Sequence, residues 1–93
     1  MKNINIFVKL PVELTIEKEN KYKKYSLELD VPSINAVLKQ ISLLYNPKVF
    51  ELLDKSGKSN SYFIFINGNL IKDTNEKIKN NDRILIISPV VGG

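Results

Sequence analysis

The stretch that decides the fold closes the chain, where residues 83–93 read RILIISPVVGG. The apolar run that follows Arg83 is typical of a strand buried inside a sheet. The remaining residues, Ser88 to Gly93, follow that strand with no polar spacer. Fully extended, such a segment reaches roughly 20 Å. We therefore predict one domain over residues 1–87 and an extended tail over residues 88–93.

A second apolar run lies upstream at residues 62–66, YFIFI, and it also predicts a strand buried on both faces. Asn67-Gly68 directly after it is a strong tight-turn signal, which leads into a short strand at residues 69–71. The polar segment after that strand has Ile78 as its expected core anchor. Because both long runs look doubly buried, we expect both near the middle of one sheet.

The first third of the chain predicts a hairpin. Residues 4–10 and residues 25–31 each alternate polar and apolar side chains, as half-buried strands do. Residues 12–16 extend the first strand or form a short separate piece. The charged stretch at residues 17–24 suits an exposed turn, and its lysines suit a solvated sheet edge that resists pairing with another edge.

One clear helix follows this hairpin. Ser33 is a good N-cap, and apolar residues then recur at helical spacing. These residues are Ile34, Val37, Leu38, Ile41, Leu44 and Tyr45. Asn46-Pro47 ends the helix and starts a shorter one, with Val49, Phe50, Leu52 and Leu53 as expected core anchors. The predicted fold class is α+β, with one main helix packed on one face of a mixed sheet.

Composition removes many chemistries. The chain has 93 residues, enough for one domain, and it contains no cysteine and no histidine. Disulfides, thiol catalysis, Cys/His zinc sites and imidazole acid–base chemistry are therefore excluded. We expect no metal site and no bound cofactor. Glu28 and Asp30 share one face of a strand, but exposed alternating carboxylates of this kind predict surface rather than an active site.

The charge and hydropathy of the chain bear on partners and location. No apolar run approaches the eighteen or so residues of a membrane span, and the N-terminus lacks a signal-peptide block. We therefore expect a cytoplasmic protein without a membrane partner. The formal net charge is +4, but the lysines are scattered along the chain. Basic charge alone is weak support for nucleic-acid binding, so we expect no nucleic-acid partner.

The tail is the strongest candidate for a functional site. Pro89, Val90 and Val91 stiffen it, and the final two residues, Gly92 and Gly93, have no side chains. Such a segment can enter a narrow channel in a partner, because glycine allows close backbone approach at the reacting end. We expect Gly93 to carry the reacting carboxylate.

Residues 81–93 resemble the end of the MoaD/ThiS sulfur carriers, which are β-grasp proteins related in fold to ubiquitin. The likeness is greatest to the small subunit of molybdopterin synthase, whose members close with a Gly-Asp turn, an apolar strand and a Pro-Pro-Val-x-Gly-Gly tail. The matching residues are Asp82, Pro89, Val90, Gly92 and Gly93. Asn67 also matches an Asn turn in that family. Asn81 stands where glycine is usual, which a left-handed turn tolerates, and Ser88 replaces the first proline.

The resemblance implies a β-grasp (ubiquitin-like) fold in which the first and last strands pair in parallel at the centre. It also implies a carrier rather than an enzyme. By this resemblance, an E1-like, ATP-dependent activating enzyme is expected to adenylate Gly93, and a sulfur donor to convert the adenylate to a thiocarboxylate. The large subunit of molybdopterin synthase is then expected to receive the tail. Pro89, Val90, Val91 and Gly92 then bind that partner.

Several alternatives remain open. The carrier could serve thiamine or tungsten-cofactor synthesis, or the chain could be a protein modifier whose Gly93 joins target lysines. It could also be a plain binding module on a β-grasp scaffold, because fold does not imply function. Docking is expected on the sheet surface beside the last strand. Most of the aromatic residues Phe7, Tyr62, Phe63 and Phe65 should belong to the core, with one of them exposed as a docking anchor.

Overall fold

A computed structural model describes residues 2–53 and 62–88 of the chain. Within these ranges the chain forms one α-helix, two short 3-10 helices and a five-stranded sheet. In chain order the elements are β1 (Lys2–Lys9), η1 (Val12–Leu14), β2 (Lys23–Leu29), α1 (Ile34–Leu44), η2 (Pro47–Leu53), β3 (Phe63–Ile66), β4 (Asn69–Ile71) and β5 (Arg83–Ile87). Each predicted strand and helix is present, with boundaries shifted by a few residues.

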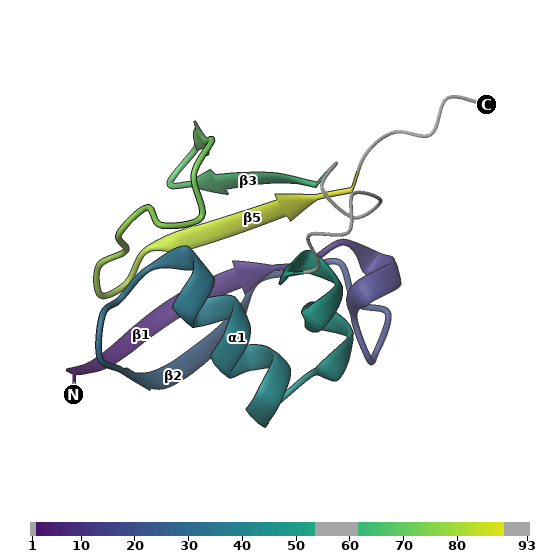
Figure 1. The fold of residues 1–93 in the computed structure, drawn as a ribbon. Coiled ribbons are helices and arrows are strands. Elements are labelled where there is room, and N and C mark those ends of the chain that lie inside the picture. The colour runs from purple at the N-terminus through teal and green to yellow at the C-terminus, as the bar shows by residue number, and fades with distance from the viewer. Residues whose placement is uncertain (1, 54–61, 89–93) are drawn as a thin grey trace.

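The sheet is mixed and has the strand order β2-β1-β5-β3-β4. β1 pairs with β5 in parallel, and the β1–β2, β3–β4 and β3–β5 pairs are antiparallel. Helix α1 lies across one face of this sheet, as Figure 1 shows. This arrangement is the β-grasp fold, so both the fold class and the parallel pairing of the first and last strands are confirmed.

The core lies between α1 and the sheet. Ile6 and Val8 of β1 and Ile84 and Ile86 of β5 are buried there, together with the large apolar residues of α1 from Ile34 to Ile41. Leu44 and Tyr45, which continue the apolar spacing at the end of the helix, are exposed. The expected N-cap is present, because the Ser33 hydroxyl accepts a hydrogen bond from the Ala36 amide at 3.2 Å. Ile78 is buried as predicted. Burying each large aliphatic side chain contributes about 1.5–3 kcal/mol, so this one layer supplies most of the stabilisation.

The second helix starts as expected, since Asn46 accepts a hydrogen bond from the Lys48 amide at 3.0 Å. Val49 is buried, and Leu52 and Leu53 pack against the core. Phe50, however, is 58% exposed, so its prediction as an anchor was wrong. The segment is a 3-10 helix with three residues per turn, so Val49 and Leu52 share the side that faces the core. Phe50 shares a different side with Leu53, which packs against the core only in part.

The prediction of double burial for the two apolar runs was also wrong. Phe63 is 51% exposed and Ile87 is 40% exposed, whereas the adjacent residues along the same strands, Ile64 and Ile86, are buried. The reason is that α1 covers one face of the sheet, while the described residues leave the other face open. We call this second face the open face of the sheet.

Candidate functional site

The predicted reacting residue and its neighbours lie outside the described part of the chain. These residues are Pro89, Val90, Val91, Gly92 and Gly93. The last described residue, Ser88, is half-buried and follows β5 directly. The site can therefore be built up to the root of the tail, and the roles of the tail residues stay predictions.

Strand β5 holds that root at the centre of the sheet. It pairs with β1 on one side, from Phe7–Arg83 to Lys9–Leu85, and with β3 on the other side. Ile84 and Ile86 insert into the core beneath it and are almost fully buried. Since packed interiors resist displacement, the position at which the chain leaves β5 is fixed by the whole domain.

The start of β5 is held by a polar cluster that we call the Asn67–Asp82 clamp. The Asn67 side-chain amide donates to an Asp82 carboxylate oxygen at 2.9 Å, and the Asn67 side-chain oxygen accepts from the Arg83 amide at 2.9 Å. The other Asp82 oxygen accepts from the Lys79 amide at 2.7 Å. Carboxylate acceptors make comparatively strong hydrogen bonds, so the clamp ties the β3–β4 turn to the beginning of β5.

Two left-handed residues shape this clamp. Asn67 has φ 51° and Asn81 has φ 71°, and the Asn81 amide donates to the Asn5 carbonyl at 2.6 Å. Asparagine tolerates this conformation better than most residues. The predicted turn at Asn67-Gly68 and the left-handed turn at Asn81 are both confirmed. In this structure the matching residues Asn67 and Asp82 position β5 and lie at the end of the strand away from the tail.

The other end of β5 carries an exposed apolar surface on the open face, which we call the β3–β5 patch. It consists of Phe63, Phe65, Leu70, Leu85 and Ile87. Phe63 is paired with Ile87 and Phe65 with Leu85, and Leu70 of β4 is opposite Phe65. Phe63, Leu70 and Ile87 are exposed, and Phe65 and Leu85 are half-buried. Contiguous exposed apolar groups of this kind mark protein contact sites.

This patch identifies the exposed aromatic that the sequence could not single out. Phe63 is the exposed one of the four, and Phe7, Tyr62 and Phe65 are half-buried. The expectation that most of them belong to the core was wrong, because only Tyr62 packs against it, whereas Phe7 and Phe65 alternate with core residues and lie on the open face. Phe63 is opposite Ile87, the residue that precedes Ser88. A partner that contacts Phe63 would therefore lie next to the root of the tail.

Lys9, Arg83 and Tyr22 form a cluster that we call the basic corner. It borders the patch on the same face. The Lys9 ammonium lies 5.9 Å and the Arg83 guanidinium 5.7 Å from the centre of the Tyr22 ring. Both distances fit cation–π contacts. Among the residues that the structure describes, neither cation forms an ion pair. The open face therefore combines apolar side chains with cations that are available to acidic groups.

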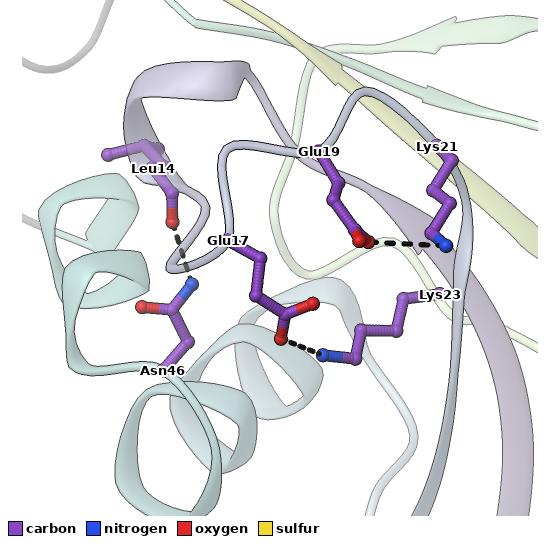
Figure 2. A network of polar contacts seen from close by, with 6 residues as sticks. All are labelled: Leu14, Glu17, Glu19, Lys21, Lys23 and Asn46. Atoms are coloured by element: carbon purple, nitrogen blue, oxygen red, sulfur yellow. Dashed lines mark hydrogen bonds and ion pairs between the residues drawn. The ribbon is translucent and has the colours of Figure 1, made fainter.

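On the covered side, a pocket of about 170 Å³ opens between β2, the end of α1 and residues 15–23. Figure 2 shows its polar contacts, in which Glu17 faces Lys23 and Glu19 faces Lys21, each at 3.3 Å. The Asn46 amide donates to the Leu14 carbonyl at 2.7 Å and fastens η1 to the helical layer. The hydrogen bond and charge of Glu17 raise the pKa of the Lys23 ammonium. These contacts pair opposite charges with each other and hold residues 15–23 in place.

Other kinds of site are missing from the described residues. In residues 2–53 and 62–88 no group of three or more acidic, cysteine or histidine side chains is arranged to hold a metal ion. Glu28 and Asp30 are exposed, as expected. None of the described helices is long and apolar enough to cross a membrane.

Together, the β-grasp sheet, the central last strand and the open apolar face define a small protein of the ubiquitin-like class. The ThiS family matches residues 14–93, which is most of the chain. The chain therefore belongs to the ThiS family. A search of curated proteins gives no match.

Solved structures agree on the fold. SAMP1 from Haloferax volcanii superposes with a TM-score of 0.67 at 16% identity, over 96% of this chain and 99% of that chain. The small archaeal modifier protein 1 (SAMP1) from Methanosarcina acetivorans gives a TM-score of 0.65 at 22% identity, over 100% of both chains. The ubiquitin of Caldiarchaeum subterraneum gives 0.51 at 14% identity, over 99% and 100% of the two chains. At these identities the likeness establishes the fold alone.

Proposed function

We propose that this chain is a sulfur carrier whose reacting group is the carboxylate of Gly93. The observation that carries the proposal is the setting of the tail root. Ser88 leaves a strand fixed at the centre of a ThiS-family fold, directly beside the exposed β3–β5 patch. The family match extends through Gly93, which supports a role for the tail itself.

The chemistry follows from the weakness of a carboxylate as an acyl donor. An activating enzyme joins the Gly93 carboxylate to the adenylyl group of ATP and releases pyrophosphate, which gives a mixed anhydride. A sulfide-level donor then attacks the acyl carbon, AMP leaves, and a thiocarboxylate remains. This group is ionised at neutral pH and is a soft nucleophile, so the carrier needs no cysteine. The sequence, which contains none, is consistent with this route.

The more specific assignment is to the small subunit of molybdopterin synthase. It rests on the resemblance of Asp82, Pro89, Val90, Gly92 and Gly93 to the ending of those subunits. In that case Pro89 to Gly92 enter the active site of the large subunit, and the acid–base residues of the reaction belong to that partner. In this proposal, residues 1–87 dock on the partner surface, and residues 88–93 carry the reacting group into its active site.

The open face supplies the docking surface in this proposal. An apolar centre bordered by Lys9 and Arg83 fits a partner surface that is apolar and bordered by acidic groups. Aromatic side chains are frequent anchors at such interfaces, and Phe63 is the exposed aromatic on the patch. Contacts that begin at Phe63 and Ile87 continue along the tail without a gap in the chain.

A protein-modifier role is the second candidate. It is favoured by one specific observation, namely that the structural neighbour from Methanosarcina acetivorans is described as a small archaeal modifier protein. The first step is the same, because Gly93 is again activated as an adenylate. The acyl group then passes to the amine of a target lysine and forms an isopeptide bond. The two candidates therefore differ in the acceptor and share the activated end.

The decisive experiment measures the intact mass of the chain after incubation with its activating enzyme, ATP and a sulfur source. The carrier proposal expects the mass change of one oxygen replaced by sulfur, dependent on ATP and trapped by a thiol-reactive alkylator. A chain that lacks Gly93 is the control, because oxidation of Met1 gives nearly the same mass change. Absence of both adenylate and thiocarboxylate with an active enzyme would overturn the proposal.

The same reaction separates the two candidates when a cell lysate is added. Lysine-linked conjugates that need Gly93 and form without added sulfur donor favour the modifier. A thiocarboxylate that is consumed without conjugate formation favours the carrier, and its small-molecule product then identifies the pathway.

A further inference from the structure

The outer edge of β2 is a surface that the carrier role does not use. β2 is the edge strand of the sheet and is seven residues long, whereas β4 at the opposite edge has three residues. Its residues Lys24, Ser26 and Glu28 are exposed. A long edge strand is a template for pairing with another strand. The lysines at the start of β2 were expected to oppose such pairing, and they do so unless an acidic residue of the other strand lies opposite them.

The hydrogen bonds that β1 forms with residues 81 and 82 fix which backbone groups of β2 point outward. The Phe7 amide donates to the Asp82 carbonyl, and the Asn5 carbonyl accepts from the Asn81 amide, so both residues direct their backbone groups toward β5. Phe7 is opposite Lys24 and Asn5 is opposite Ser26, so these pairs do not bond to each other. By the same alternation, the N–H and C=O groups of Lys24, Ser26 and Glu28 point away from β1.

One side-chain contact agrees with this direction. The Tyr45 hydroxyl, at the end of α1, lies 3.5 Å from the Ser26 carbonyl oxygen, which is therefore on the outer edge. A hydrogen bond at this distance is weak, since the usual O–H···O length is about 2.7–2.8 Å. The Ser26 carbonyl is thus available to a better donor.

The charges along this edge are self-complementary. Lys24 and Glu28 lie two positions on either side of Ser26, and both side chains are on the open face. We propose that the β2 edge binds a second copy of this chain, in an antiparallel pair centred on Ser26. Lys24 of each copy then lies opposite Glu28 of the other, and Ser26 lies opposite Ser26.

This register also satisfies the backbone. The three outward residues of one copy lie opposite the three outward residues of the other, so each N–H meets a C=O. The Ser26 amide of the second copy replaces the distant Tyr45 hydroxyl at the Ser26 carbonyl. Symmetric pairing of one patch with itself is the commonest form of association between identical chains. The two sheets join into one, with both open faces on the same side.

The pairing is independent of the carrier proposal. β1 lies between β2 and the strands that carry the β3–β5 patch, so Phe63 and Ile87 stay accessible in the pair. The net charge of +4 on each copy opposes association at long range, but salt screens it beyond about 8 Å at physiological ionic strength. Local Lys24–Glu28 contacts at the edge are shorter than this distance.

Sedimentation equilibrium of the full chain tests the proposal at physiological ionic strength. We expect a monomer–dimer equilibrium at protein concentrations between about 10 µM and about 1 mM, which is the range suited to a small interface. Amide hydrogen exchange identifies the strand at which the two copies meet. Protection of the Lys24, Ser26 and Glu28 amides should rise with protein concentration, while protection of Tyr25 and Leu27, which bond to β1, should stay constant.

A charge swap supplies the matched control. Lys24→Glu and Glu28→Lys each place like charges opposite one another twice, so each should weaken the dimer about tenfold. The double variant Lys24→Glu/Glu28→Lys restores opposite charges and should return the affinity to within about threefold of the original. Lys24 and Glu28 are exposed in each copy, so the substitutions should not disturb the fold. Circular dichroism checks that the variants fold.

Three outcomes would overturn the proposal. One is a monomer throughout this concentration range. Another is a dimer that neither single substitution weakens, which would assign the association to a different surface. The third is a double variant as weak as the two single variants combined, which would exclude the register centred on Ser26.

Discussion

The two ends of β5 are built in opposite ways. At the beginning of the strand, Asn67 and Asp82 form side-chain and backbone hydrogen bonds that fix the strand to the β3–β4 turn. At the end of the strand, Phe63 and Ile87 are exposed on the open face and have no polar contacts of this kind among the described residues. The beginning of the strand is therefore held by contacts within the domain, whereas its end exposes apolar side chains that a partner protein can contact.

This difference separates stability from function along a single strand. Substitutions at the clamp should change the free energy of unfolding and leave docking unchanged in the folded protein. Substitutions at the β3–β5 patch should weaken docking and change the free energy of unfolding less, because exposed side chains contribute little to folding. The predictions below test that separation.

The largest expected effect is on stability, at the clamp. Asn67→Ala removes the two side-chain bonds to Asp82 and the Arg83 amide, keeps the backbone bond to the Arg83 carbonyl, and places alanine at φ 51°. Two net hydrogen bonds and one left-handed residue together should lower the free energy of unfolding by about 2–3 kcal/mol. Urea unfolding followed by circular dichroism measures this change.

Two further variants control this result. Asn69→Ala changes the same residue type two positions away on exposed β4 and should cost less than about 0.5 kcal/mol. Asn67→Gly keeps the turn conformation but removes the bonds, so it should fall between the two. An Asn67→Ala protein as stable as the original would show that the clamp does not hold β5.

The clamp also shows the limit of local sequence patterns. Asn67-Gly68 and Asn81-Asp82 were each predicted as turns, and both are turns. Their bonding to each other was not predicted, because the partners are 15 residues apart and meet only after β3 and β5 pair. The same holds for Tyr22, which meets Lys9 and Arg83 from three separate segments.

The strands show a different limit. The element order was predicted, because alternation, caps and turn residues are local signals. The central parallel pair was expected only from the resemblance to a known family, since periodicity alone cannot fix strand order. The run at residues 62–66 was predicted as buried on both faces, yet Phe63 is half exposed. An apolar contact surface and a buried core use the same side chains, so an unbroken apolar run cannot distinguish them. The tail is beyond the described residues, so its chemistry stays a prediction from sequence.

The next effect is on partner binding, at the patch. Phe63→Glu places a carboxylate on the proposed docking surface and should weaken binding to the activating enzyme by about tenfold or more. Its free energy of unfolding should change by about 1 kcal/mol or less, because half of the Phe63 surface is already exposed in the folded chain. Calorimetric titration and urea unfolding measure the two quantities.

Phe50→Glu is the matched control for that experiment. Phe50 is another exposed phenylalanine, but it belongs to η2 in the helical layer rather than to the open face. Binding should therefore stay within about twofold of the original. Equal losses from Phe50→Glu and Phe63→Glu would remove the basis for docking through the β3–β5 patch.

A smaller effect is expected at the tight turn of the clamp. Gly68 has φ 88°, and a methyl group added there meets nothing within 4 Å. The cost of Gly68→Ala is therefore conformational alone, and it should lower the free energy of unfolding by about 1 kcal/mol. Asn81→Gly, at φ 71°, should change it by less than about 0.5 kcal/mol, because asparagine already tolerates this region. A larger loss from Asn81→Gly than from Gly68→Ala would mean that the Asn81 side chain has a role beyond turn geometry.

The smallest effect concerns the covered side of the sheet, opposite the β3–β5 patch. Burial raises the pKa of the Tyr25 hydroxyl above 10.0, Lys23 opposes the shift, and Glu17 adds to it. Since the folded chain holds this proton more tightly than the unfolded chain, the contribution to stability is complete below pH 10 and is lost as the pH rises through the folded-state pKa. Unfolding free energies measured from about pH 9 to about pH 11 should therefore fall more steeply for the original chain than for Tyr25→Phe. The raised pKa of Tyr62 acts in the same direction in both proteins and cancels from this comparison. Parallel curves would show that Tyr25 does not stay protonated more readily in the folded state.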